Sequence, residues 1–163
     1  MDAPDRSRSL LFAGFLLFLL ALLTGLAIPV LNNPRMGLSA HLTGVMNGFF
    51  LILLGLSWER LRLAGRSASL VYGLALYAAY TNWTINLLGA AMGTGKLTPL
   101  VAGGRVGRPW QEVLVNTGAV SLAVAVVVCL ILVLRSLRKP AVAAERVIGE
   151  VGPSKPHPLA PSP

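Results

Sequence analysis

RMGLSAHLTGVMNGFFLILLG, residues 35–55, is the segment from which the architecture of this chain can be inferred. It has the apolar character of a membrane-spanning helix, and it contains His41, the only histidine before the C-terminal tail. An imidazole is costly to bury in a bilayer unless something binds it, so an intramembrane histidine marks a candidate functional site. At 3.6 residues per turn, Gly44, Gly48 and Gly55 fall within about 60° of His41, and Asn47 lies about 120° away.

The composition extends this interpretation to the whole chain. Of its 163 residues, 55% are hydrophobic and 12% are charged. Because a soluble domain carries about 25% charged residues, we predict an all-α integral membrane protein. Four apolar runs are long enough to cross the hydrocarbon core as helices, and they cover about residues 10–30, 38–56, 70–92 and 113–134. They predict one four-transmembrane-helix bundle within residues 1–139, followed by a disordered tail over residues 140–163.

The basic residues predict the orientation. With four spans, the N-terminus, the loop over residues 57–69 and the tail lie on one side of the membrane and hold ten of the 14 Lys and Arg residues. The other four are Arg35, Lys96, Arg105 and Arg108. The positive-inside rule then predicts a multi-pass protein of the cytoplasmic (inner) membrane with both termini cytoplasmic. The net charge of +8 follows this pattern and does not indicate nucleic-acid binding.

Polar residues of three predicted helices converge in the outer half of the bundle. His41 and Asn47 open the second helix, and Asn82 and Asn86 lie in the middle and second half of the third. The last helix begins with Glu112 and Asn116. The two members of each pair on the third and last helices are four residues apart and share a helix face. We expect one site to which all three helices contribute.

Two interpretations of the histidine segment stay open. Gly44 and Gly48 form a small-xxx-small motif, which serves either close helix packing or contact with a flat ligand. His41 is either a hydrogen-bonding residue between helices or an axial metal ligand. The chain has no second intramembrane histidine and no Cys/His cluster, so a protein-only zinc site does not fit. A single histidine is compatible with haem, whose macrocycle supplies the other iron ligands.

The remaining polar and aromatic residues also have structural alternatives. Asparagines within spans often only bond neighbouring helices. Glu112 could satisfy backbone donors near a helix N-terminus rather than act in catalysis. Tyr77, Tyr80 and Trp83 could form an aromatic packing stripe or the wall of a substrate pocket.

Three blocks resemble the hydroxylaminobenzene mutase family. They are NPRMGLSAHLTGVMNG at residues 33–48, Tyr80-x-Asn82-Trp83, and Gly103-Gly104 followed by Trp110-Gln111-Glu112-x-Leu114-Val115-Asn116. The resemblance covers about residues 10–135. It implies conversion of aryl hydroxylamines to 2-aminophenols by movement of a hydroxyl group from nitrogen to the ortho ring carbon.

The chain is also distantly similar to styrene oxide isomerase, through a histidine followed six positions later by Asn-Gly, here His41 and Asn47-Gly48. This similarity implies haem b between the subunits of a trimer, with His41 as its axial ligand. The similarity further implies that the iron acts as a Lewis acid and that Asn47 orients the substrate. A tyrosine of that family, four residues after an asparagine, corresponds here to Asn86. This difference favours a substrate other than an epoxide.

From the residues and these resemblances we expect a membrane isomerase that acts on a small aromatic substrate by intramolecular hydroxyl transfer. His41 would bind the iron, beside Gly44 and Gly48. The expected catalytic residues are Asn47, Asn82, Asn86 and Glu112. The expected substrate-binding residues are Tyr77, Tyr80, Trp83 and Asn116. The alternatives are isomerisation of an aryl epoxide to an aldehyde, and a non-catalytic haem-binding membrane protein.

Overall fold

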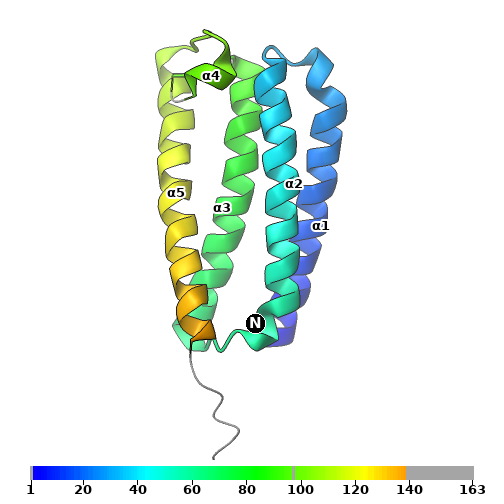
Figure 1. Ribbon diagram of the computed structural model, residues 1–163, viewed down its shortest axis with the longest axis vertical. Helices are drawn as coiled ribbons and strands as arrows, with labels where there is room; N and C mark the ends of the chain where they lie inside the picture. Colours follow the sequence, from blue (N-terminus) through cyan, green and yellow to red (C-terminus); the bar gives the residue numbers. More distant parts are fainter. Residues whose placement is uncertain (1, 97, 139–163) are drawn as a thin grey trace, which may run out of the picture.

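The computed structural model describes residues 2–96 and 98–138, and within these ranges all regular secondary structure is helical (Figure 1). The all-α prediction is confirmed. The expected tail, residues 140–163, lies outside the described residues. The elements are α1 (Ala3–Ala27), η1 (Ile28–Val30), α2 (Pro34–Ser57), η2 (Trp58–Arg60), α3 (Gly65–Met92), α4 (Pro99–Ala102) and α5 (Pro109–Leu137).

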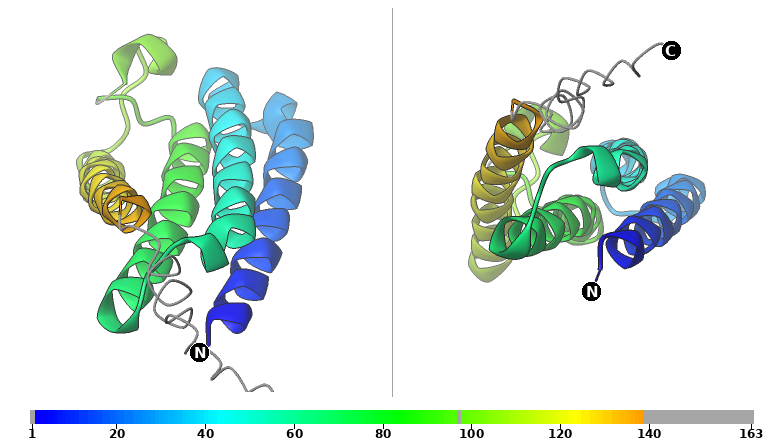
Figure 2. Two further views of the ribbon diagram at one scale, coloured as in Figure 1. Left: turned by 60° about the horizontal axis from the view of Figure 1, so that its bottom comes forward. Right: turned by 90° about the horizontal axis from the view of Figure 1, so that it is seen from below.

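The long helices α1, α2, α3 and α5 run side by side, and the short α4 lies across one end (Figure 1). Seen from below, α3 lies between α2 and α5, and α1 packs on the far side of α2 (Figure 2). Helix α5 therefore packs mainly on α3. This arrangement leaves α3, the most polar of the long helices, as the element shared by both halves of the bundle.

In the part of the chain that the structure describes, three helices are long and apolar enough to cross a membrane, namely Ala3–Val30, Pro34–Arg60 and Pro109–Leu137. They support a membrane protein. Helix α3 is 28 residues long but does not join them. Its asparagines, threonines and tyrosines lower its hydropathy, although its length would suffice for a span. The crossing of the membrane by α3, and with it the orientation of the termini, stays a prediction.

The Asn32-Asn33-Pro34 turn holds the α1–α2 hairpin against the rest of the molecule. The Asn33 side chain caps α2 by accepting a 3.3 Å hydrogen bond from Met36 N, and Pro34 occupies the first turn of that helix. The backbone N–H of Asn33 donates to Ala90 O at 3.0 Å, and its side-chain amide donates to Ala102 O. One buried asparagine thus connects the start of α2 with the ends of α3 and α4.

Glycines set the close approach of α1 and α2. A Cβ atom on Gly48 would lie 3.0 Å from Gly14 O, and one on Gly44 would lie 2.7 Å from the Ala21 Cβ atom. These contacts account for Gly44 and Gly48 as packing residues. Contact with a flat cofactor, the other interpretation of this strip, is not needed to explain them.

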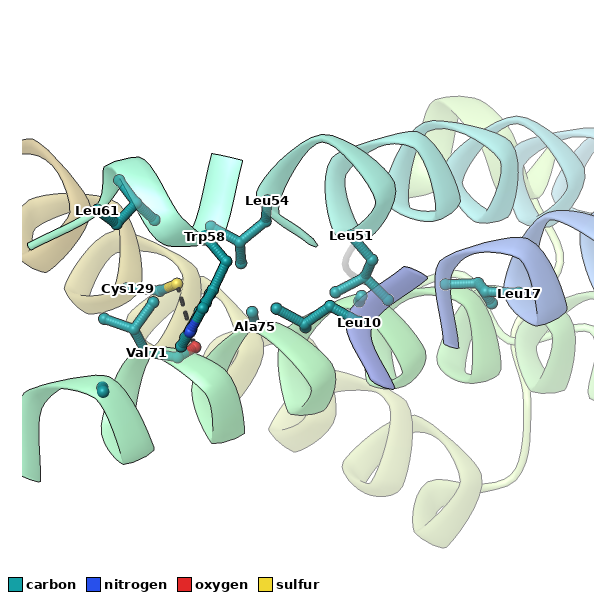
Figure 3. Close-up of a cluster of buried hydrophobic side chains, with 11 residues drawn as sticks. Leu10, Leu17, Leu51, Leu54, Trp58, Leu61, Val71, Ala75 and Cys129 are labelled. Carbon is teal, nitrogen blue, oxygen red and sulfur yellow. Dashed lines mark hydrogen bonds between the residues drawn. The ribbon is translucent and has the colours of Figure 1, made fainter. Parts of the chain in front are cut away.

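The apolar core lies toward the end of the bundle opposite α4. Figure 3 shows Leu10, Leu51, Trp58 and Val71 packed together from α1, α2, η2 and α3. Cys129 of α5 completes this cluster, fully buried, with its Sγ 3.7 Å from Val71 O. Apolar packing at this end leaves the α4 end free to hold polar groups.

Candidate functional site

A cavity of about 200 Å³ lies at the α4 end, between α3, the segment after it and α5. Four of the residues singled out in the sequence line it together: Asn82, Asn86, Glu112 and Asn116. The other lining residues are Met36, Ile85, Thr94, Gly95, Lys96, Thr98, Val115, Ala119 and Leu122. The expected convergence of polar groups from α3 and α5 is therefore present, and α2 contributes Met36.

Glu112 fastens the α3–α5 connection to the first turn of α5. Its carboxylate is 4% exposed and accepts backbone hydrogen bonds from Gly95 N at 3.0 Å, Lys96 N at 3.0 Å and Gly107 N at 2.8 Å. Both carboxylate oxygens are thus occupied by N–H donors, which is a strong arrangement for a charged acceptor. The structure gives Glu112 the role of satisfying backbone donors, and a catalytic role stays a prediction.

Two polar atoms of the cavity-lining residues have no hydrogen-bond partner within the described ranges. They are Thr94 Oγ1 and Asn116 Oδ1, and both atoms are buried. The Thr94 residue is 0% exposed. Buried polar side chains are hydrogen-bonded in the large majority of cases, so two unpaired oxygens among the residues of one cavity are consistent with a ligand site.

Asn86 and Asn82 form a fixed amide pair on one wall of the cavity. The Asn86 amide nitrogen donates to Asn82 O at 2.8 Å and to Asn82 Oδ1 at 3.1 Å. The Asn86 oxygen accepts a 3.0 Å hydrogen bond from Ser39 Oγ of α2. This network connects α2 to α3 and uses both ends of the Asn86 amide.

His41 lies at the contact between α1 and α2, and it is not among the residues that line the cavity. Its Nδ1 is 2.8 Å from Ala21 O. Because a carbonyl oxygen only accepts, Nδ1 is the donor in this contact, and in the neutral form of the ring Nε2 then has the lone pair. The ring fits there because the neighbouring residue of α1 is Gly25, on which a Cβ atom would lie 2.8 Å from His41 Nδ1.

This environment of His41 fits a metal ligand. Ligating histidines usually donate their other ring N–H to a carbonyl or carboxylate, which fixes the tautomer and the ring orientation. The side chain is half-buried, so the ring retains some access from outside the chain. Across residues 2–96 and 98–138 there is no group of three or more His, Cys, Asp or Glu residues that could hold a metal ion. A cofactor that brings its own remaining ligands, such as haem, is compatible with this single imidazole.

The other predicted residues are distributed over different contacts. Asn47 donates to Ala79 O of α3 at 3.3 Å. Trp83 donates from its indole nitrogen to Thr24 Oγ1 at 3.1 Å, and Tyr80 donates from its hydroxyl to Ala13 O at 2.8 Å. Both aromatic residues thus bond to α1, on the other side of α3 from the cavity.

Tyr77 contacts α5 and not α1. Its hydroxyl is 2.7 Å from Ser121 Oγ of α5, in an open groove between the two helices. The predicted single site is therefore divided in one chain. One group, His41, Tyr80 and Trp83, bonds to α1. The other group, Asn82, Asn86, Glu112 and Asn116, lines the cavity between α3 and α5.

Several residues of these two groups were not singled out in the sequence. Thr94 and Gly107 lie in a connection that composition identifies only as glycine-rich, and Gly25 lies in the most uniformly apolar run. Thr24 and Gly25 are nevertheless adjacent interruptions of a Leu-, Ala- and Phe-rich helix. That interruption is the signal from which a close contact with α1 could have been inferred.

A family model described as styrene oxide isomerase matches residues 6–138. Two proteins of Ectopseudomonas oleovorans are also similar to this chain. Hydroxylaminobenzene mutase HabB is 44% identical over 138 residues, which is 84% of this chain and 84% of HabB. Hydroxylaminobenzene mutase HabA is 44% identical over 107 residues, which is 64% of this chain and 79% of HabA. No solved structure matches. The matches confirm the resemblance drawn from the sequence.

Proposed function

This chain belongs to the styrene oxide isomerase family, and on that basis we propose that it rearranges aryl hydroxylamines to 2-aminophenols. The family and the two mutase relatives make the chain an isomerase, so the non-catalytic alternative is not supported. The relative that covers 84% of the chain is a hydroxylaminobenzene mutase, and this similarity favours the hydroxylamine as substrate.

The proposed reaction needs no outside atom. The N–O bond and one ortho C–H bond break, a C–O and an N–H bond form, and the hydroxyl group and the proton both stay in the product. Water would compete with the migrating hydroxyl for the cationic ring, so a closed site suits this chemistry. The observation that carries the proposal is the cavity of about 200 Å³, which combines apolar walls with asparagine side chains, and two of its lining residues have a buried oxygen without a partner within the described part of the chain.

The cavity has the right size and polarity for a small aromatic substrate. A dry protein cavity of about 150 Å³ is large enough to bind benzene. In our proposal the ring lies against Ile85, Val115 and Leu122. Asn82 and Asn116 hold the polar end, and the Asn86 network keeps Asn82 in place.

His41 is proposed to hold haem b through Nε2, the nitrogen that the Ala21 bond leaves free. When bound, haem b supplies a Lewis acid that draws electron density from the N–O group. Because His41 does not line the cavity of its own chain, this proposal requires that copies of the chain associate. A homotrimer is the proposed assembly, following the similarity to the isomerase family.

The proposed topology completes this interpretation. We place α3 across the membrane as a fourth span, with both termini in the cytoplasm and the cavity near the outer surface of the inner membrane. The Asn82–Asn86 amide pair and the Tyr80 hydroxyl then face protein rather than lipid, because they bond to α2 and α1. Buried polar residues are tolerated in spans under that condition.

Isomerisation of an aryl epoxide to an aldehyde is the second candidate, and it is favoured by the description of the matching family model. It uses the same kind of Lewis acid. Asn86 argues against it, because this position corresponds to a tyrosine of styrene oxide isomerase.

The test supplies purified protein in lipid nanodiscs with phenylhydroxylamine and, separately, with styrene oxide. We expect 2-aminophenol from the first and no phenylacetaldehyde from the second. Aldehyde without aminophenol would refute the leading assignment. An absorption spectrum of the wild type beside His41→Ala tests the cofactor, with the exposed neighbour Leu42→Ala as the control. A Soret band that disappears only in His41→Ala supports haem binding by this residue, and a band retained in His41→Ala excludes it.

A further inference from the structure

We propose that Thr94 and Asn116 recognise the hydroxylamino group in the α3–α5 cavity, and that they thereby select substrates that can donate a hydrogen bond. The inference rests on the proposed function and deepens it. Thr94 lies outside the three sequence blocks that resemble the mutase family, in the glycine-rich connection after α3.

Two oxygens on cavity-lining residues, Thr94 Oγ1 and Asn116 Oδ1, are buried and lack a hydrogen-bond partner within the described part of the chain. A buried unpaired polar atom destabilises the folded protein, because the atom has lost its bonds to water. Two such atoms on the residues of one cavity are tolerable if a ligand pairs with them in the working protein.

The two oxygens require different hydrogen-bonding groups from a ligand. An amide oxygen only accepts, so Asn116 Oδ1 requires a donor, whereas a threonine hydroxyl can donate or accept. An aryl hydroxylamine offers one N–H and one O–H donor, and its nitrogen and oxygen also accept. An aryl epoxide offers no donor and would leave Asn116 Oδ1 unpaired.

Glu112 holds the residues of both oxygens in place. Thr94 is next to Gly95, whose N–H donates to the Glu112 carboxylate. Asn116 lies one turn after Glu112 on α5. A Cβ atom on Gly107 would lie 2.7 Å from Thr94 Cγ2, so Gly107 allows the connection to close over the threonine. The same carboxylate thus positions the segment that carries Thr94 and the helix turn that carries Asn116.

Unpaired oxygens in the binding site give substrate specificity. A site built to hydrogen-bond a substrate group rejects an analogue lacking that group far more strongly than an apolar pocket rejects an analogue of slightly different shape. The cavity should therefore discriminate between substituted benzenes of similar size by whether the substituent donates a hydrogen bond.

The experiment measures ligand affinity, so it does not depend on turnover. Aniline, which donates, and toluene, which does not, are titrated calorimetrically into nanodiscs carrying the wild type, Thr94→Val or Asn116→Leu. Empty nanodiscs correct for partition into lipid. Each substitution should weaken aniline binding by about 3- to 10-fold, the value of one ordinary hydrogen bond. Toluene affinity should stay within twofold. Thr117→Val is the matched control, because Thr117 follows Asn116 on α5 but does not line the cavity.

Thermal stability provides a second readout. In ligand-free protein, replacing an unpaired buried oxygen by an apolar isostere is neutral or stabilising, so neither variant should unfold at a lower temperature than the wild type. Aniline affinity that is unchanged in both variants, or weakened equally in Thr117→Val, overturns the inference, because aniline would then bind without the two oxygens.

The two proposals can fail separately. A wild type that binds aniline in a Thr94-dependent manner but does not convert phenylhydroxylamine refutes the proposed function alone. A wild type that forms 2-aminophenol, with KM and aniline affinity unchanged in Thr94→Val and Asn116→Leu, refutes the inference alone.

Discussion

Replacing Glu112 by glutamine should open the connection that covers the cavity. The carboxylate accepts three backbone hydrogen bonds, from Gly95, Lys96 and Gly107. Glutamine has nearly the same shape, but its amide nitrogen cannot accept, so at least one of these bonds is lost. The others become bonds to a neutral oxygen.

The magnitude follows from the values of such bonds. A hydrogen bond to a charged group contributes about 1.5–3 kcal/mol, and a neutral one about 0.5–1.5 kcal/mol. Losing one charged bond and weakening two others should lower the free energy of local opening by about 3.5–6 kcal/mol. Each 1.4 kcal/mol is a tenfold change, so the population of the open connection should rise about 300- to 20,000-fold.

Hydrogen exchange measured by mass spectrometry in nanodiscs tests this expectation, because exchange of a protected amide follows the free energy of its local opening. Peptides spanning residues 93–108 should exchange about 300- to 20,000-fold faster in Glu112→Gln, while peptides from the core around Trp58 should be unaffected. Asp5→Asn removes an exposed carboxylate from the first turn of α1 and serves as the control. Exchange of residues 93–108 within threefold of the wild type would show that Glu112 does not hold this segment closed.

Three further substitutions test the contacts of the histidine segment. Gly44→Ala should destabilise the protein by about 1–3 kcal/mol through overpacking against α1 and α3. Gly73→Ala should not, because a Cβ atom on Gly73 would meet no atom within 4 Å. Equal melting temperatures of the two variants in detergent would contradict the packing role of Gly44. Gly25→Ala places a Cβ atom 2.8 Å from His41 Nδ1. It should therefore reduce the Soret absorbance of the purified protein at temperatures where the variant is still folded. An unaltered Soret band would mean that cofactor binding does not require the imidazole in this position. Asn47→Ala removes one hydrogen bond between helices, and such a bond averages about 0.6 kcal/mol in a membrane. If Asn47 orients the substrate, turnover should fall more than tenfold while stability falls by only about this amount. A smaller loss of turnover would indicate a structural role alone.

Much of the architecture could be predicted because its causes are local in the chain. Runs of apolar residues indicate helices, and the Asn33-Pro34 pair marks a turn and the start of α2, since a side-chain cap and a fixed proline φ act within a few residues. The pairing of Glu112 with Asn116, and of Asn82 with Asn86, follows from helix periodicity alone. These predictions agree with the helices that the structure contains.

The site was only partly predictable, because depth along a bundle does not determine which helices touch. His41 and Asn86 were expected at one level, yet His41 bonds α1 and Asn86 lines the cavity beside α5. Trp83 lies one residue after Asn82, so on a helix it points about 100° away. It bonds to Thr24 of α1 instead.

By itself, the sequence determined an all-α membrane isomerase with its histidine next to a glycine strip and its asparagines in pairs. Tertiary structure alone decided that Glu112 holds a distant connection, that Gly25 makes room for the imidazole, and that Thr94 joins Asn116 at one cavity. The physical reason is that helix formation and hydropathy depend on neighbouring residues. Hydrogen-bond partners and cavities depend on which faces of remote segments pack together.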